Sequence, residues 1–114
     1  MTEPTSQPIR IPFPDGLRET GIAVAVADGQ EIVVLKQDDG YRAVDRWCPH
    51  EEGDLGEGMM YGKNIKCPVH GYIFDLTRGQ CINQFTMSIA VYDVEVDGDD
   101  LLLRQLSETK GREW

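Results

Sequence analysis

The chain has only two histidines and three cysteines among its 114 residues, and it lacks a long apolar run. Because a membrane-spanning helix needs about 20 mostly apolar residues, we expect none here. The first residues, Met1-Thr2-Glu3-Pro4, are polar with no apolar stretch behind them, so we expect no secretory signal and a cytoplasmic location. Basic residues are also scarce: 11 Lys and Arg stand against 20 Asp and Glu, a formal charge of −9. This balance argues against nucleic-acid binding and favours a soluble monomer.

Each histidine lies close to a cysteine. The two pairs are Cys48-Pro49-His50 and Cys67-Pro68-Val69-His70. Two thiolates and two imidazoles are the donor set of a Rieske-type 2Fe–2S cluster, and they also suit a tetrahedral zinc ion. Zinc modules usually pair like ligands in short knuckles, whereas each half-site here mixes one Cys with one His. The spacing therefore favours two bridged irons, with a zinc-stapled interaction module as the alternative.

The residues around these pairs resemble the Rieske family. The segment contains C-x-H, an acidic and glycine-rich stretch, C-P-x-H-G and an aromatic-rich strand that ends at Phe74-Asp75. The resemblance is strong over residues 45–79 and extends over 9–104. It implies an all-β, Rieske-like fold of antiparallel sheets and a 2Fe–2S cluster. By resemblance, the ligands of this cluster are Cys48, His50, Cys67 and His70.

At three positions the chain resembles the low-potential branch of that family. In the high-potential, quinol-oxidising branch two further cysteines join the cluster loops by a disulfide, but the matching positions here are Gly53 and Val69. That branch also has a serine that donates a hydrogen bond to a bridging sulfide, where this chain has Tyr72. Fewer donors to sulfur leave the reduced cluster less stabilised. We therefore expect a potential toward the lower end of the ~ −150 to +300 mV Rieske range.

Alternating apolar residues and turn dipeptides predict a single all-β domain over residues 1–114. Asp28-Gly29, Asp38-Asp39-Gly40 and Asp97-Gly98 are expected to close hairpins, and no long helical pattern appears. Both ends of the chain are expected to form a β base, with a small cluster-binding unit inserted at about 46–76. Residues 1–8 and 107–114 are polar and are expected to be flexible tails. The expected strands are 9–11, 22–27, 31–36, 41–45, 89–96 and 101–104.

No nucleophile, general base or substrate pocket can be identified in the sequence, so we expect a carrier rather than an enzyme. Resemblance implies that it takes electrons from a flavin-dependent NAD(P)H reductase and passes them to a terminal oxygenase of the ring-hydroxylating type. The acidic charge would steer it toward basic partner surfaces, or serve solubility alone. The alternative is the small subunit of an assimilatory NAD(P)H nitrite reductase, although all four ligands are present. The third cysteine, Cys81, is expected to be a core thiol.

Overall fold

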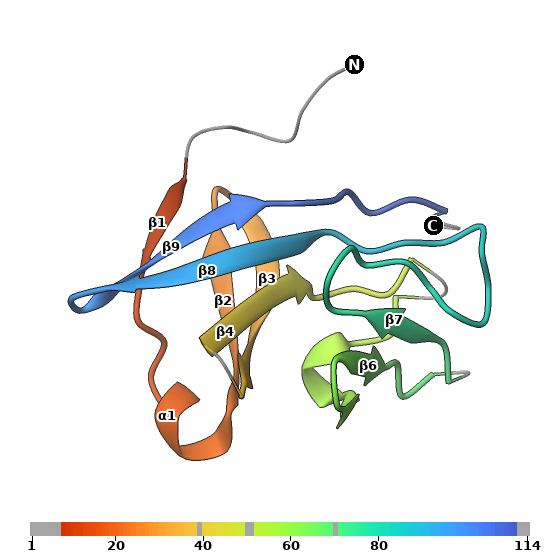
Figure 1. The fold of residues 1–114 in the computed structure, drawn as a ribbon, viewed down its shortest axis with the longest axis horizontal. Helices are drawn as coiled ribbons and strands as arrows, with labels where there is room; N and C mark the ends of the chain where they lie inside the picture. The colour runs from red at the N-terminus through yellow and green to blue at the C-terminus, as the bar shows by residue number, and fades with distance from the viewer. Residues whose placement is uncertain (1–7, 39, 50–51, 70, 112–114) are drawn as a thin grey trace.

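Two antiparallel sheets make up the computed structural model, which describes residues 8–38, 40–49, 52–69 and 71–111 (Figure 1). The larger sheet has the strand order β1-β9-β8-β4-β3-β2, and the smaller has the order β5-β6-β7. This arrangement confirms the predicted all-β fold. The elements in chain order are β1 (Ile9–Pro12), α1 (Leu17–Thr20), β2 (Ile22–Ala27), β3 (Gln30–Gln37), β4 (Gly40–Asp45), η1 (Leu55–Glu57), β5 (Met59–Tyr61), β6 (Asn64–Lys66), β7 (Ile73–Asp75), β8 (Val91–Asp97) and β9 (Asp100–Gln105).

Tight turns set the register of the larger sheet. Asp28 and Gly29 both have positive φ, 52° and 79°, which is the backbone of a type I′ hairpin turn between β2 and β3. At the β8–β9 turn Gly98 has a φ of 63°. These two turns lie where the sequence predicts them, and Asp39 of the third expected turn lies outside the described residues. The strand expected from residue 89 begins at Val91.

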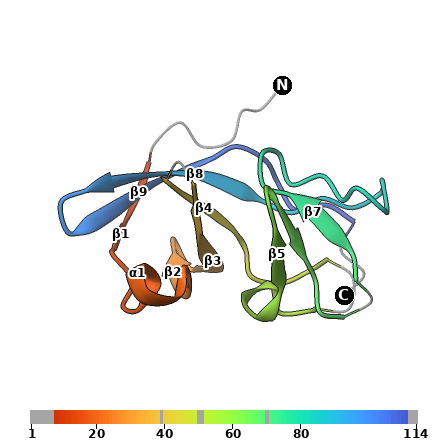
Figure 2. The same cartoon turned by 60° about the horizontal axis from the view of Figure 1, so that its bottom comes forward.

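Strand β3 is buried on both faces and joins two apolar cores. Ile32 and Val34 pack in a core inside the larger sheet, together with Leu101 and Leu103 of β9. Val33 and Leu35 point to the opposite face of β3, into a core shared with the smaller sheet. Figure 2 shows the smaller sheet as a separate lobe beside the larger one. Because both cores use β3, the two lobes are held together by continuous apolar packing.

Two short helices were not predicted. Helix α1 lies between Gly16 and Gly21, whose φ angles of 80° and 78° suit glycine, and its Leu17 is fully buried. A helix of one turn presents no periodic pattern that sequence analysis could detect. Nothing helical in the described part of the chain has the length and apolar content to cross a bilayer.

The C-terminal segment corrects the prediction of a flexible tail, as far as residue 111. The Ser107 hydroxyl accepts a hydrogen bond from the N–H of Val91 and donates one to the carbonyl of Ile89. Further along, the Thr109 hydroxyl donates to the buried carboxylate of Asp45 at 2.6 Å. Polar residues such as these suggest a loose tail in the sequence. Here their hydroxyl groups make hydrogen bonds to backbone N–H and carbonyl groups just before β8 and at its start.

Replacing Thr109 by valine is expected to destabilise the fold by about 1–3 kcal/mol, because Asp45 and the N–H of Ala90 each lose a partner. Urea unfolding followed by circular dichroism measures the change. Thr86→Val is the control, since among the described residues its hydroxyl donates a hydrogen bond only to the exposed Gln84 side chain. Equal midpoints for Thr109→Val and wild type would show that the segment contributes nothing to stability.

Candidate metal centre

The two cysteine-bearing loops close in the same way. In the first, the N–H of Cys48 donates to the carbonyl of Gly53 at 2.8 Å. In the second, the N–H of Cys67 donates to the carbonyl of Tyr72, also at 2.8 Å. Each hydrogen bond therefore spans five positions and encloses one histidine of the sequence. Proline follows each cysteine and fixes φ at the start of the loop.

The loops also share an unusual backbone position. The fourth residue after each cysteine, Glu52 in the first loop and Gly71 in the second, has a positive φ, 53° and 73°. Glycine adopts this conformation freely, whereas glutamate does so at a cost. A strained non-glycine residue is typical of a site that the surrounding structure holds in place for function.

Direct contact joins the two loops. A Cβ added to Gly53 would overlap the sulfur of Cys67 and would lie 3.3 Å from Cγ2 of Val69. Both Cys48 and Cys67 are fully buried in the core that the smaller sheet shares with β3. Gly53 and Val69, the positions compared above with a disulfide, therefore face each other. The absence of a side chain at Gly53 lets the first loop approach the second cysteine.

Arg46 closes the base of the first loop. Its guanidinium donates two hydrogen bonds to Asp54, at 3.2 and 3.0 Å, and a third to Glu31 at 2.6 Å. Burial raises the pKa of Asp54, but the hydrogen bonds from Arg46 and Gly56 and the guanidinium charge outweigh burial, so the pKa lies below its usual value. The pair thus holds the two ends of the loop together as ions.

A second support was not found from the sequence. The Asn83 side chain donates to the carbonyl of Gly71 at 3.2 Å and accepts from the N–H of Ile73 at 3.0 Å. Asn83 thereby ties the end of the second loop to the segment that follows β7. A lone asparagine carries no sequence signal for such a contact, since it depends on how distant segments pack.

Other predicted residues fall as follows. The thiol of Cys81 is buried, as expected, and lies 3.2 Å from Oδ1 of Asn83. Trp47 is only half-buried, and its indole N–H donates to Glu31 at 3.3 Å. The ring of Tyr72 packs against the core of the smaller sheet. His50 and His70 lie outside the described residues, so their placement stays a prediction.

The described residues fit the thiolate half of an iron–sulfur ligand set. Two buried cysteines lie on loops that face each other, and each loop is closed by the same kind of backbone hydrogen bond. The apolar core around both cysteines excludes water. Iron in a 2Fe–2S cluster takes thiolate ligands of this kind, and two histidines on the second iron make the cluster a Rieske centre. The geometry on the cysteine side therefore agrees with the predicted cofactor.

Comparisons with known proteins point to the same cofactor. The family model for the Rieske [2Fe-2S] domain matches residues 9–103. The ferredoxin component of the naphthalene 1,2-dioxygenase/salicylate 5-hydroxylase systems of Ralstonia sp. is 25% identical over 91 residues, which cover 79% of this chain and 88% of that protein.

Solved structures with this fold include a dioxygenase ferredoxin and a putative nitrite reductase small subunit. The ferredoxin of carbazole 1,9a-dioxygenase from Nocardioides aromaticivorans IC177 matches with a TM-score of 0.69 and 29% identity, covering 86% of this chain and 97% of that one. A putative NADH-dependent nitrite reductase small subunit from Mycobacterium tuberculosis matches with a TM-score of 0.73, covering 87% and 96%, but at 18% identity this likeness concerns the fold alone.

The match extends over both sheets and both cysteine loops. The chain belongs to the Rieske [2Fe-2S] domain family, whose cofactor is a Rieske-type 2Fe–2S cluster.

Proposed function

We propose that the chain is a low-potential Rieske ferredoxin. It carries single electrons from a flavin-dependent NAD(P)H reductase to a terminal oxygenase of the ring-hydroxylating type. The matched pair of cysteine loops is the observation that carries this proposal. The ferredoxin components among its relatives, which the chain matches over most of their length, support the role in an oxygenase system. The chain itself is an electron-transfer component and not an enzyme.

In this proposal Cys48 and Cys67 bind one iron, and His50 and His70 bind the other. When bound, the cluster supplies one-electron redox chemistry. The protein's part would be to hold the ligands in place, supported by the Arg46–Asp54 pair at the base of the first loop, and to keep water from the sulfurs, supported by the burial of Cys48 and Cys67. Gly53 and Val69 offer no disulfide and Tyr72 replaces a serine, so the potential is expected to be low.

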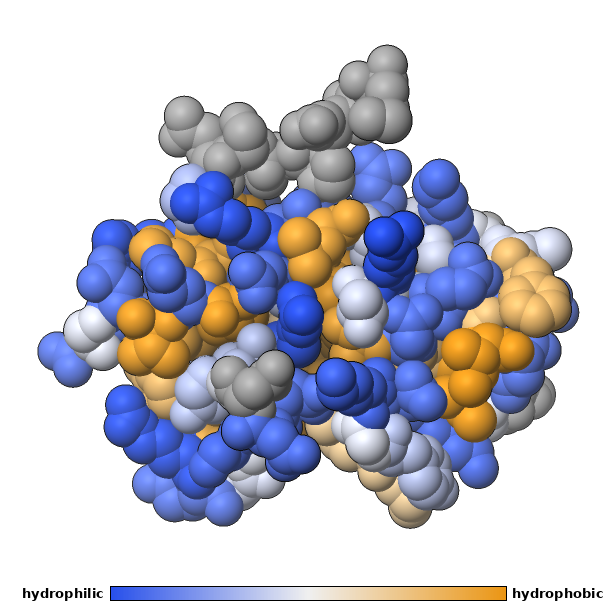
Figure 3. Space-filling view, viewed as in Figure 1, coloured by the Kyte–Doolittle hydropathy of each residue, from blue (hydrophilic) through white to orange (hydrophobic). Residues whose placement is uncertain are grey.

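The surface beside the second loop suits a transient partner. A hollow of about 490 Å³ next to Cys67 is lined by the apolar side chains of Met59, Tyr61 and Pro68, with Glu57 and Lys66 among its polar residues. Met59 and Tyr61 are about half exposed. A small apolar patch among polar groups is typical of a short-lived electron-transfer contact. On the face shown in Figure 3, apolar patches are likewise separated by polar side chains.

The nitrite reductase small subunit remains the alternative function. The fold is compatible with it, but the sequence retains both Cys–His pairs, and such subunits often lack the cluster ligands. A zinc-stapled interaction module is disfavoured by the mixed half-sites. We further propose a cytoplasmic monomer, organised as one domain with the cluster-binding unit at about 46–76.

The first test concerns the ligands. Cys48→Ser and Cys67→Ser are each expected to lose the cluster, while Cys81→Ser, a matched change at a third buried cysteine, keeps it. Iron and sulfide content, the visible spectrum and the EPR signal of the reduced protein measure the outcome. Full iron and sulfide in both ligand variants would contradict the assignment, and a red-brown wild-type protein without a Rieske EPR signal would exclude the proposed cofactor.

The second test concerns the contact between the loops. Gly53→Ala is expected to shorten the lifetime of the cluster under a chelator by about tenfold, because the added methyl group forces the loops apart. Gly98→Ala is the control: unlike Gly53, Gly98 has a left-handed backbone, so this change strains the β8–β9 turn, but the added Cβ would meet nothing within 4 Å. Bleaching of the visible spectrum with time gives both rates. If the control bleaches as fast as Gly53→Ala, the loop contact is not the cause.

The third test concerns the acidic charge. If the formal charge of −9 steers docking, reduction by the reductase slows as ionic strength rises from ~10 mM to ~0.5 M, since the Debye length falls from about 30 Å to below about 10 Å. Stopped-flow absorbance measures the rate. Reduction by a neutral small-molecule donor is the control and is expected to change little. A reductase rate independent of salt would leave the charge a role in solubility alone.

A further inference from the structure

Lys66 is the last residue of β6, the central strand of the smaller sheet, and it directly precedes Cys67. Alternation along the strand turns Ile65 into the apolar core and leaves Lys66 on the opposite face. Pairing with Met59 of β5 and Ile73 of β7 fixes its backbone on both sides. The backbone from which this side chain extends is therefore held firmly beside the second cysteine loop.

The side chain of Lys66 extends over the end of that loop. A Cβ added to Gly71 would lie 3.1 Å from Cε of Lys66 and 3.9 Å from its Nζ. Gly71 directly follows His70 in the sequence, and its carbonyl accepts the hydrogen bond from Asn83. The ammonium group therefore lies beside the loop end, next along the chain to a predicted ligand.

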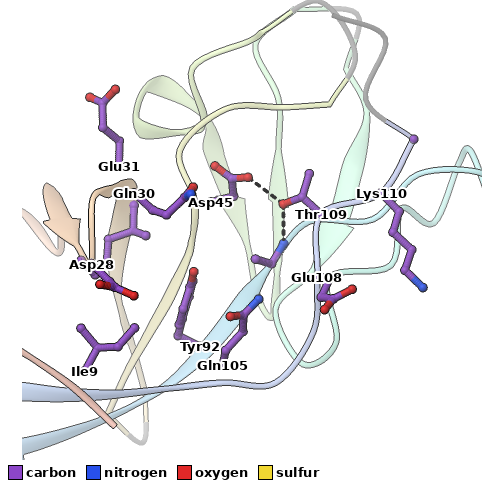
Figure 4. Close-up of a pocket in the computed structure, with 14 residues that line it drawn as sticks. Ile9, Asp28, Gln30, Glu31, Asp45, Tyr92, Gln105, Glu108, Thr109 and Lys110 are labelled. Atoms are coloured by element: carbon purple, nitrogen blue, oxygen red, sulfur yellow. Dashed lines mark hydrogen bonds between the residues drawn. The ribbon is translucent and has the colours of Figure 1, made fainter. Parts of the chain in front are cut away.

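Two other charged groups that are shielded from water have a partner inside the protein. The carboxylate of Asp45, which lines a hollow on the larger sheet, accepts a hydrogen bond from the Thr109 hydroxyl (Figure 4). The half-buried guanidinium of Arg46 pairs with Asp54. Lys66 is also half-buried, but it takes part in none of the ion pairs found between described residues. Its charge is therefore not cancelled by a carboxylate within the described part of the chain.

The nearest candidate for such a carboxylate is exposed. Glu57 and Lys66 both line the hollow of about 490 Å³ beside Cys67. Glu57 is exposed, whereas Lys66 is half-buried. Water and salt screen the charge of an exposed side chain more strongly than that of one partly removed from solvent. The positive charge of Lys66 therefore remains effective at the second loop.

A positive charge beside the ligand loops favours the reduced state of a bound cluster. Uptake of one electron adds one negative charge there, and an opposite charge nearby stabilises it. We propose that Lys66 raises the reduction potential of the cluster and offsets part of the lowering expected from the missing hydrogen-bond donors. The electron comes from the reductase of the proposed function, and no covalent bond forms or breaks. This inference rests on the electron-carrier role and adds a residue that sets how readily the carrier accepts its electron.

Potentiometric titration of the cluster-loaded protein tests the role of this charge. Lys66→Met removes the ammonium and keeps an unbranched chain over Gly71, Lys66→Glu reverses the charge, and Lys66→Arg keeps it. Lys36→Met is the matched control, since Lys36 also lies beside a glycine, Gly21, but on β3 and outside both cysteine loops. Visible absorbance gives the ratio of reduced to oxidised protein at each solution potential. The EPR signal of each reduced variant shows whether the cluster itself is unchanged.

At a fixed solution potential, Lys66→Met is expected to lower the ratio of reduced to oxidised protein about threefold, and Lys66→Glu about tenfold. A tenfold change corresponds to about 59 mV for one electron, so the midpoint potentials fall by about 30 mV and about 60 mV. Lys66→Arg and Lys36→Met are expected to change the ratio by less than about 1.5-fold, because the first keeps the charge and the second removes a distant, screened one.

A midpoint potential of Lys66→Met equal to that of wild type would overturn the inference, and so would an equal fall in Lys36→Met. An equal fall in Lys66→Arg would assign the effect to packing of the chain and not to its charge, which also contradicts the inference. If Lys66→Met does not hold the cluster, the comparison of Lys66→Glu with Lys66→Arg decides. In each case a Rieske EPR signal leaves the carrier role intact, whereas its absence from the reduced wild-type protein would contradict the proposed function itself.

Discussion

Burial of both faces of β3 is the constraint on which the rest of the structure depends. A strand that alternates apolar and polar residues can build one core, but the run from Ile32 to Leu35 builds two. One core lies between strands of the larger sheet, and the other contains the two cysteines of the loops. Cys48 and Cys67 therefore lie in the same core as Val33 and Leu35 of β3, which limits how far the two cysteines can move.

This packing explains how short, irregular loops can hold a cofactor. Each loop is closed by a backbone hydrogen bond from its cysteine, and each is supported from outside: the first by Arg46 and Asp54, the second by Asn83. The positive φ of Glu52 shows that the local backbone bears a cost which these contacts offset. Rigid ligands reduce the rearrangement needed when an electron arrives, which suits a carrier that must exchange electrons quickly.

The sequence predicted the features that depend on neighbouring residues and missed those that depend on packing. Asp28-Gly29 predicted a hairpin because the turn chemistry lies in two adjacent residues. The two Cys–His pairs predicted the family, because the spacing of Cys and His within each pair can be read directly from the sequence. The hydrogen bonds of Thr109 and Asn83 were missed, since each joins segments that only the tertiary fold brings together. The tail was misjudged for the same reason: polar composition is compatible with a frayed end and with a strand-like segment whose hydroxyls bond to the sheet.

The same division explains how the fold persists at low identity to its relatives. A TM-score of 0.69 at 29% identity means that the same fold forms from two sequences that differ at most positions. In the proposed function, the loops carry the electron and the surface around them selects the partner. In this chain that surface combines Met59 and Tyr61 with a strongly acidic overall charge. Apolar contact alone binds many partners weakly, whereas an acidic field that steers docking, as proposed, would favour partners with basic surfaces. The two together favour a fast, specific and short-lived encounter, which is what a carrier moving between two proteins requires.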